Sequence, residues 1–160
     1  MYTSRLDLPE HVRHAAIALL QAMLANAVDL VRQAKQAHWN VKGPNFFMLH
    51  QLFDALHDTV EEFEDTIAER ITALGGTADA RVQTVAATTV LYDYPIAASS
   101  GEAHLKALAG SLGEFGKHAR AAIEAAAVAG DADTADLFTG LSRECDKQLW
   151  FVEAHLVGSN

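Results

Sequence analysis

Residues 37–76 of this chain read AHWNVKGPNFFMLHQLFDALHDTVEEFEDTIAERITALGG. The Gly43-Pro44 pair near the start ends any helix that precedes it, and the Gly75-Gly76 pair stops the helix that follows. Between the two pairs, apolar residues recur at the three- and four-residue spacing of an amphipathic helix. The stretch therefore predicts a helix over residues 46–74, with Asn45 as its N-cap, that is roughly 43 Å long at ~1.5 Å per residue. This length is typical of a helical bundle.

The segments on either side of this stretch also favour long helices. Residues 10–40 contain neither proline nor glycine and carry apolar side chains at helical spacing, which predicts a first helix. Ser99 and Glu102 form a capping-box pattern at the start of a third helix, which Gly130 ends. A fourth helix is expected from Asp131 or Asp133 to about residue 156.

Residues 77–98 form a connection that is too long for a hairpin and is expected to contain a short helix. A crossover of this length allows the second and third helices to lie parallel, as in some four-helix bundles. The prediction is an all-α fold, a four-helix bundle with a long crossover between the second and third helices. We expect residues 1–160 to form a single domain, with residues 1–8 as a short N-terminal arm.

The composition excludes several classes of protein. Half of the 160 residues are hydrophobic, but the chain has no run of about 18 uncharged apolar residues that predicts a membrane span, and it starts without a secretory signal pattern. The single cysteine, Cys145, argues against a disulfide scaffold and is expected to be a packed or semi-buried side chain in a reducing compartment. A cytoplasmic location is therefore expected. The net charge of −9 opposes nonspecific binding to nucleic acid and suits cations.

One face of the predicted 46–74 helix carries side chains that bind metals. The face is formed by His50, Asp54, Asp65 and Glu69. At ~100° per residue these side chains span about 100° around the helix and lie well away from its apolar stripe, so they do not point into their own bundle. Imidazole and carboxylate together suit iron, manganese or zinc. The face is therefore a candidate metal site.

The two ends of this face cannot bind one ion within a single chain. His50 and Asp65 are separated by roughly 22 Å along the helix axis, whereas a metal–ligand bond is about 2 Å long. An antiparallel copy of the helix across a two-fold axis brings the Asp65 and Glu69 end of one subunit to the His50 and Asp54 end of the other, and creates two equivalent sites. His38, at the edge of the apolar face of the first helix, is placed to join the His50 end.

Spacing alone leaves other interpretations open. An acidic helix face is most often simply solvated, and His38 beside Trp39 also suits an interface or a core position. His57 and Glu61 lie on the same face between its two ends, as parts of a polar interface or as accessory cation sites. The whole face is also compatible with an inert assembly protein in which it forms only a polar interface.

Taken together, these motifs resemble the Dps family of mini-ferritins. The similarity is carried by HWNVKGPNFFMLHQLFD at residues 38–54, DTIAER at residues 65–70 and LGG at residues 74–76. The C-terminal half adds DTADLFT at residues 133–139, Arg143, Asp146-Lys147 and WFVEAH at residues 150–155. The resemblance covers nearly the whole chain.

The resemblance implies a ferritin-like four-helix bundle that assembles as a hollow homododecamer. It also implies a di-iron ferroxidase centre, shared between two-fold related subunits, that oxidises Fe²⁺ with hydrogen peroxide preferred over dioxygen and deposits a ferric mineral inside. Consuming iron and peroxide together protects DNA from hydroxyl radicals. Carried over onto this sequence, the catalytic iron ligands are His38, His50 and Asp54 of one subunit with Asp65 and Glu69 of the other. Each of these positions has the expected residue type.

The resemblance also suggests roles for four further residues. Trp39, beside the site, is a candidate radical quencher or a packed interface residue. Asp131, Asp133 and Asp136 occupy the region where family members have acidic pores on a three-fold axis. Asp131 and Asp133 are equally expected to cap the last helix, so Asp136 is the better pore candidate.

Direct DNA binding divides the family. Members that bind DNA often carry a mobile Lys-rich arm, whereas this chain has no lysine before Lys35. A dodecameric shell with a charge of −9 on each subunit repels DNA. We therefore expect weak or absent direct DNA binding at neutral pH, and association with the nucleoid is not favoured. The alternative function is that of a DNA-compacting Dps whose main role is direct DNA binding.

Overall fold

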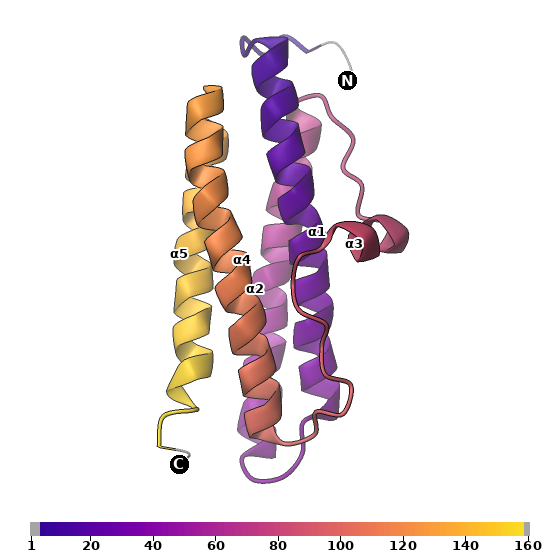
Figure 1. The fold of residues 1–160 in the computed structure, drawn as a ribbon, viewed down its shortest axis with the longest axis vertical. Coiled ribbons are helices and arrows are strands. Elements are labelled where there is room, and N and C mark those ends of the chain that lie inside the picture. Colours follow the sequence, from indigo (N-terminus) through magenta and orange to yellow (C-terminus); the bar gives the residue numbers. More distant parts are fainter. Residues whose placement is uncertain (1–3, 159–160) are drawn as a thin grey trace.

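The computed structural model describes residues 4–158, which contain five helices and no strand. The helices are α1 (Glu10–Asn40), α2 (Phe46–Ala73), α3 (Val82–Thr88), α4 (Gly101–Ala129) and α5 (Ala132–Ala154). The four long helices form the bundle, and α3 lies beside α1 within the crossover (Figure 1). The predicted all-α bundle is confirmed, including the short crossover helix. Residues 1–3 of the predicted arm lie outside the described residues.

The long crossover decides how the helices are paired. α1 packs against α2, and α4 packs against α5. The connection returns along the whole bundle before α4 begins, so α2 and α4 run in the same direction (Figure 1). The backbone N–H of Lys42 donates to the carbonyl of Ser99 at 3.0 Å, which ties the turn between α1 and α2 to the start of α4. This contact ties together the end of the bundle where His38 and His50 lie.

The core divides α2 into two faces. Its inward side chains are at most 6% exposed, and they are Phe53, Leu56, Val60, Phe63, Ile67 and Ile71. These residues pack in the same cluster as leucines and alanines of α1 and α4. The acidic side chains of α2 remain outside this cluster, as the helical spacing predicted.

The helix ends differ in part from the prediction. α4 is capped by Ser100 rather than Ser99, because Ser100 has the extended backbone of an N-cap and its Oγ accepts a backbone N–H three residues on, at 3.2 Å. Glu102 forms a surface ion pair instead of completing a capping box. Asn45 occupies the N-cap position of α2, but its backbone is left-handed, with φ of 63°, and its side chain makes no capping bond. Gly130 ends α4 as predicted, with φ of 93°.

By length and composition alone, α1 is able to cross a membrane, with a mean hydropathy of 1.5 over its most apolar window. Polar residues interrupt the helix, so α1 contains no uninterrupted apolar run of membrane-spanning length. Half of that window is buried inside the bundle. The central helix of a bundle meets the same criterion, since its apolar side chains pack against neighbouring helices.

His104, at the start of α4, is a fully buried histidine. Its Nδ1 lies 2.6 Å from the hydroxyl of Tyr94. Burial disfavours the charged ring and lowers the pKa of His104, against the opposing effect of a hydrogen bond to the backbone of Asn40.

We expect the stability of the fold to fall as the pH drops below about 6.5, because the unfolded chain then binds a proton that the buried His104 does not accept. The loss ends below the lowered pKa of the folded protein, where both states are protonated. Thermal unfolding measured from about pH 7.5 to 5.5 tests this, with His118→Phe as the control on the same helix. His104→Phe should reduce the pH dependence and His118→Phe should not. Equal dependence in both variants would contradict the assignment.

Candidate metal centre

The turn between α1 and α2 brings His38 and His50 together. The chain reverses through positive φ angles at Gly43 (91°) and Asn45 (63°), between the last turn of α1 and the first turns of α2. The two imidazole rings are stacked, with 3.6 Å between their centroids and 22° between their planes. His38 therefore lies at the same end of α2 as His50.

The backbone of each histidine holds the ring of the other. His38 Nδ1 lies 2.8 Å from the carbonyl oxygen of His50, and His50 Nδ1 lies 2.8 Å from the carbonyl oxygen of His38. Because a carbonyl oxygen only accepts hydrogen bonds, both Nδ1 atoms carry the ring hydrogen. In the neutral imidazole, each Nε2 atom then keeps a lone pair. An imidazole whose other nitrogen donates to a backbone carbonyl is the usual arrangement of a metal-binding histidine.

Asp54, one turn after His50, provides the carboxylate at this end. Its Oδ1 lies 3.6 Å from His38 Nδ1 and 2.5 Å from the Nζ of Lys35 on α1. The hydrogen bond from Lys35 lowers the pKa of Asp54, so the carboxylate is charged at neutral pH. Lys35 was not among the predicted site residues, although its position three residues before His38 places both on one face of α1. A cation at Asp54 has to compete with this lysine.

We expect Lys35→Met to raise the affinity of this end for a divalent cation by roughly two- to fivefold, since it removes a competing, partly exposed ion pair. Titration with Co²⁺, followed by its visible absorption, measures the change. Lys106→Met on α4 is the matched control, because it removes the same charge from an exposed pair with Glu102. If both substitutions raised the Co²⁺ affinity equally, the change in net charge alone would explain the effect, and the contact between Lys35 and Asp54 would not.

Asp65 and Glu69 form the other end of the predicted face. Both are exposed on α2, and neither carboxylate has a hydrogen-bond or ion-pair partner within residues 4–158. They lie on the same continuous helix as His50, so at ~1.5 Å per residue the two ends are roughly 22 Å apart. One protomer thus presents two separate half-sites.

The remaining candidates fall into different environments. Trp39 is 64% exposed at the end of α1. Asp131 is only 1% exposed; its side chain caps α5 and pairs with Arg70 at 2.8 Å. Of the two roles expected of Asp131, the structure therefore supports capping. Asp133 and Asp136 are exposed and remain the pore candidates.

Cys145 is packed as expected. It is fully buried, and its thiol donates to the carbonyl of Leu112 at 3.3 Å. Burial raises the pKa of Cys145 to about 12, which keeps the thiol protonated at neutral pH. A thiol in this state is a poor nucleophile and a poor metal ligand.

The chain is similar to ferritin-like proteins over most of its length. Residues 17–158 match the family model of the ferritin-like domain. A DNA protection during starvation protein of Agrobacterium fabrum is 45% identical over 150 residues, which cover 94% of this chain and 93% of that protein.

Solved structures show the same relationship. DpsC from Streptomyces coelicolor has a TM-score of 0.94 and 28% identity, covering 99% of this chain and 93% of that chain. Dps from Microbacterium arborescens in the high iron form has a TM-score of 0.88 and 33% identity, covering 96% of this chain and 99% of that chain.

Proposed function

Because the chain belongs to the Dps family of ferritin-like proteins, we propose that it is a ferroxidase and iron-storage subunit that acts in the cytoplasm. Its substrate is Fe²⁺, its preferred oxidant is hydrogen peroxide, and its product is a ferric mineral inside a homododecamer. Protection of DNA follows from removing the two reactants that generate hydroxyl radicals. The high iron form of the Microbacterium arborescens relative and the name of the Agrobacterium relative support this proposal.

The observation that carries the proposal is the pair of crossed hydrogen bonds between His38 and His50. These bonds fix the orientation of both rings in the absence of a metal. They use the Nδ1 hydrogen of each ring and leave Nε2 as the nitrogen that can bind a metal. The two Nε2 atoms offer imidazole nitrogen, and Asp54, whose Oδ1 lies 3.6 Å from His38 Nδ1, offers carboxylate oxygen at the same end of α2. These are the donor types that suit iron.

The centre is completed by Asp65 and Glu69 of the partner subunit, across a two-fold axis that sets the two α2 helices antiparallel. Their two carboxylates hold the first iron and stabilise the ferric product through their charge. His50 and Asp54 hold a second, weaker iron, for which Lys35 competes. The isologous pairing creates two identical centres in each dimer.

The oxidation balances over two irons. Each Fe²⁺ gives up one electron, and one hydrogen peroxide takes up both electrons as its O–O bond breaks to give two hydroxide ions. Because one peroxide receives both electrons, it does not undergo the one-electron reduction that releases a hydroxyl radical. The protein residues hold the two Fe²⁺ ions side by side, so that both electrons are delivered to the same peroxide.

The test is anaerobic addition of hydrogen peroxide to the Fe²⁺-loaded assembled protein. We expect about two Fe²⁺ to be oxidised per peroxide, with no hydroxyl radical detected by a spin trap. After repeated additions, an iron-filled shell should be seen by sedimentation. A ratio of one iron per peroxide with radical release would mean that the protein does not pair the electrons, and the proposal would be wrong.

Two further roles belong to the same proposal. Asp133 and Asp136, exposed at the start of α5, are candidate pore residues through which Fe²⁺ is drawn by negative charge. Trp39, exposed beside the histidine pair, is a candidate radical quencher or an interface residue in the assembled shell.

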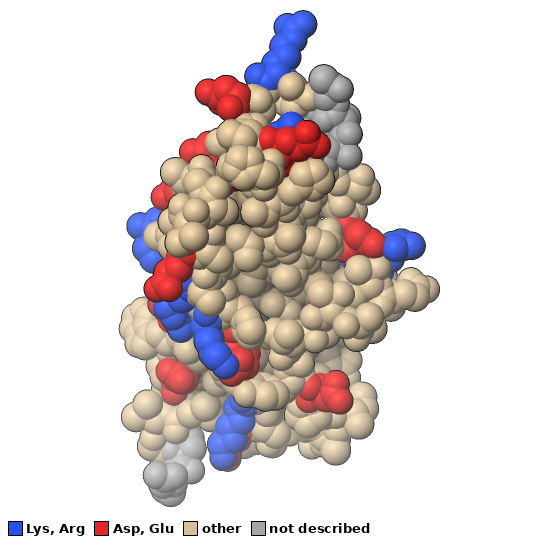
Figure 2. Space-filling view, turned by 45° about the horizontal axis from the view of Figure 1, so that its top comes forward, with Lys and Arg blue, Asp and Glu red and all other residues tan. Residues whose placement is uncertain are grey.

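The surface charge does not favour direct DNA binding. On the face shown in Figure 2, Lys and Arg are interspersed with Asp and Glu and form no broad basic patch. The net charge of −9 per chain adds a repulsive field around the assembly. No feature of the described residues favours DNA compaction as the main role.

We expect no retention of linear duplex DNA in a gel-shift assay at neutral pH, at either about 50 mM or about 200 mM salt, because binding through phosphates needs a cationic surface. A band that is shifted at low salt and released at high salt would show phosphate contacts. That result would contradict the charge argument and favour the DNA-compacting alternative.

A further inference from the structure

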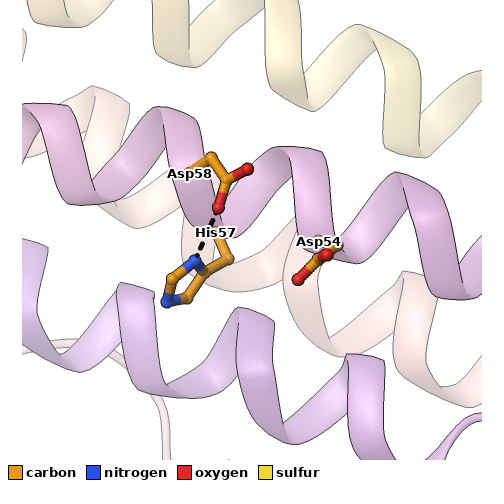
Figure 3. Close-up of side chains that lie close together, drawn as sticks. All are labelled: Asp54, His57 and Asp58. Atoms are coloured by element: carbon orange, nitrogen blue, oxygen red, sulfur yellow. Dashed lines mark hydrogen bonds and ion pairs between the residues drawn. The ribbon is translucent and has the colours of Figure 1, made fainter.

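A second group of metal-binding side chains lies next to the proposed ferroxidase residues. Asp54, His57 and Asp58 each offer one ligand atom, and these atoms all lie within 4.8 Å of one another. Figure 3 shows the three side chains on one stretch of α2, with the His57 ring bonded to Asp58. Only Asp54 belongs to the ligand set described above. His57 and Asp58 therefore have no part in the proposed iron oxidation.

His57 is positioned as a ligand rather than as a surface residue. It is 9% exposed, although it lies on the acidic face of α2. Its Nδ1 lies 3.0 Å from Asp58 Oδ1, and this is its only hydrogen bond or ion pair within residues 4–158. A carboxylate oxygen only accepts hydrogen bonds, so the Nδ1–H of His57 donates to Asp58. A metal ion bound by both side chains would take the place of this hydrogen bond.

The surroundings of this group are rich in negative charge. The next two turns of α2 carry the acids Glu61, Glu62, Glu64 and Asp65. In the proposed two-fold pairing, this middle part of α2 faces its own copy, so the acids of both subunits approach each other. A bound cation reduces that repulsion.

We propose that Asp54, His57 and Asp58 bind a divalent first-row transition-metal ion, at a site that shares only Asp54 with the ferroxidase centre. One imidazole nitrogen with two carboxylate oxygens is the donor set that suits Fe²⁺, Mn²⁺ or Zn²⁺ and disfavours Mg²⁺ and Ca²⁺. Asp54 is common to both sites. Because its carboxylate has two oxygens, one oxygen can bind a metal at each site. Binding at this site goes beyond the proposed function and does not depend on iron oxidation.

The experiment uses the assembled protein carrying Asp65→Ala and Glu69→Ala, so that the carboxylates of the ferroxidase centre are absent. Co²⁺ is the probe, followed by its visible absorption, and the number of ions bound per subunit is counted with and without His57→Gln and Asp58→Asn. We expect these two substitutions to remove one Co²⁺ per subunit. Glu62→Gln is the control, because it changes an exposed acid on the same helix and should leave the count unchanged.

A crystal of the same protein soaked in Co²⁺ gives the second measurement. Anomalous scattering is expected to show an ion in contact with Asp54 and His57, and to lose it in the His57→Gln and Asp58→Asn variant. An unchanged ion count, or ions bound only elsewhere, would overturn the proposed site. If the wild-type protein failed to oxidise iron, the Co²⁺ result would stand unaffected, so the two proposals fail separately.

Discussion

The Asp65→Ala and Glu69→Ala double variant is expected to oxidise Fe²⁺ at least about tenfold more slowly than the wild type. Loss of groups that only orient metal ligands lowers metal affinity or activity by ~10- to 100-fold. Loss of two anionic ligands should lower the activity at least as much. Both residues are exposed on α2, far from the core of their own chain, so the fold should be retained. Stopped-flow absorbance of the ferric product measures the initial rate.

The matched control is Glu62→Ala with Glu124→Ala. It also removes two exposed acids from the long helices and therefore gives the same net charge. If this control slowed oxidation as much as the loss of Asp65 and Glu69, a general effect of negative charge would explain both results. A wild-type rate in the Asp65 and Glu69 double variant would show that the proposed iron site is wrong.

Co-expression of two inactive variants tests whether the centre is shared. One variant lacks His50 and Asp54, and the other lacks Asp65 and Glu69. In a mixed dimer, one of the two centres receives all four intact side chains, and random pairing therefore restores about a quarter of the wild-type centres. A centre built within a single chain could not be restored by mixing. Recovery of activity would thus support the two-fold arrangement, and its absence would rule that arrangement out.

The second large effect is expected from Arg70→Met, which should lower the free energy of unfolding by about 3 kcal/mol, because removal of one partner leaves a buried charge unpaired. Arg70 reaches from the end of α2 to Asp131 at 2.8 Å and to the Thr134 hydroxyl at 3.1 Å, both at the start of α5. Although burial opposes it, hydrogen bonds from Thr134 and the charge of Arg70 lower the pKa of Asp131, so this buried residue is ionised.

Urea unfolding at a fixed protein concentration measures the change, because assembly adds to the apparent stability. Adding Asp131→Asn to Arg70→Met should recover part of the loss, since asparagine still caps α5 and carries no charge. Arg120→Met is the control, because its ion pair with Asp146 is exposed and should contribute at most about 1 kcal/mol. Equal losses from Arg70→Met and Arg120→Met would contradict the argument from burial.

The sequence by itself determined the number of long helices and most of their limits. Gly43-Pro44 and Gly130 mark helix ends through backbone conformations that other residues rarely adopt, and the observed φ angles of both glycines are positive. The three- to four-residue apolar spacing placed the acids of α2 outside the core, because this depends only on helix geometry. The choice of Ser99 over Ser100 as the cap of α4 was wrong, since both residues suit the pattern and only the backbone distinguishes them.

The tertiary structure decided which side chains meet. The crossed bonds between His38 and His50 depend on the exact path of the turn, which no spacing rule specifies. The pairing of Asp54 with Lys35 depends on how α1 packs against α2. Capping residues and pore residues look alike in a sequence, whereas the burial of Asp131 separates them. The sequence thus sets what each helix presents on each face, and packing between helices sets the partner of each side chain, because contacts between distant segments require the whole fold.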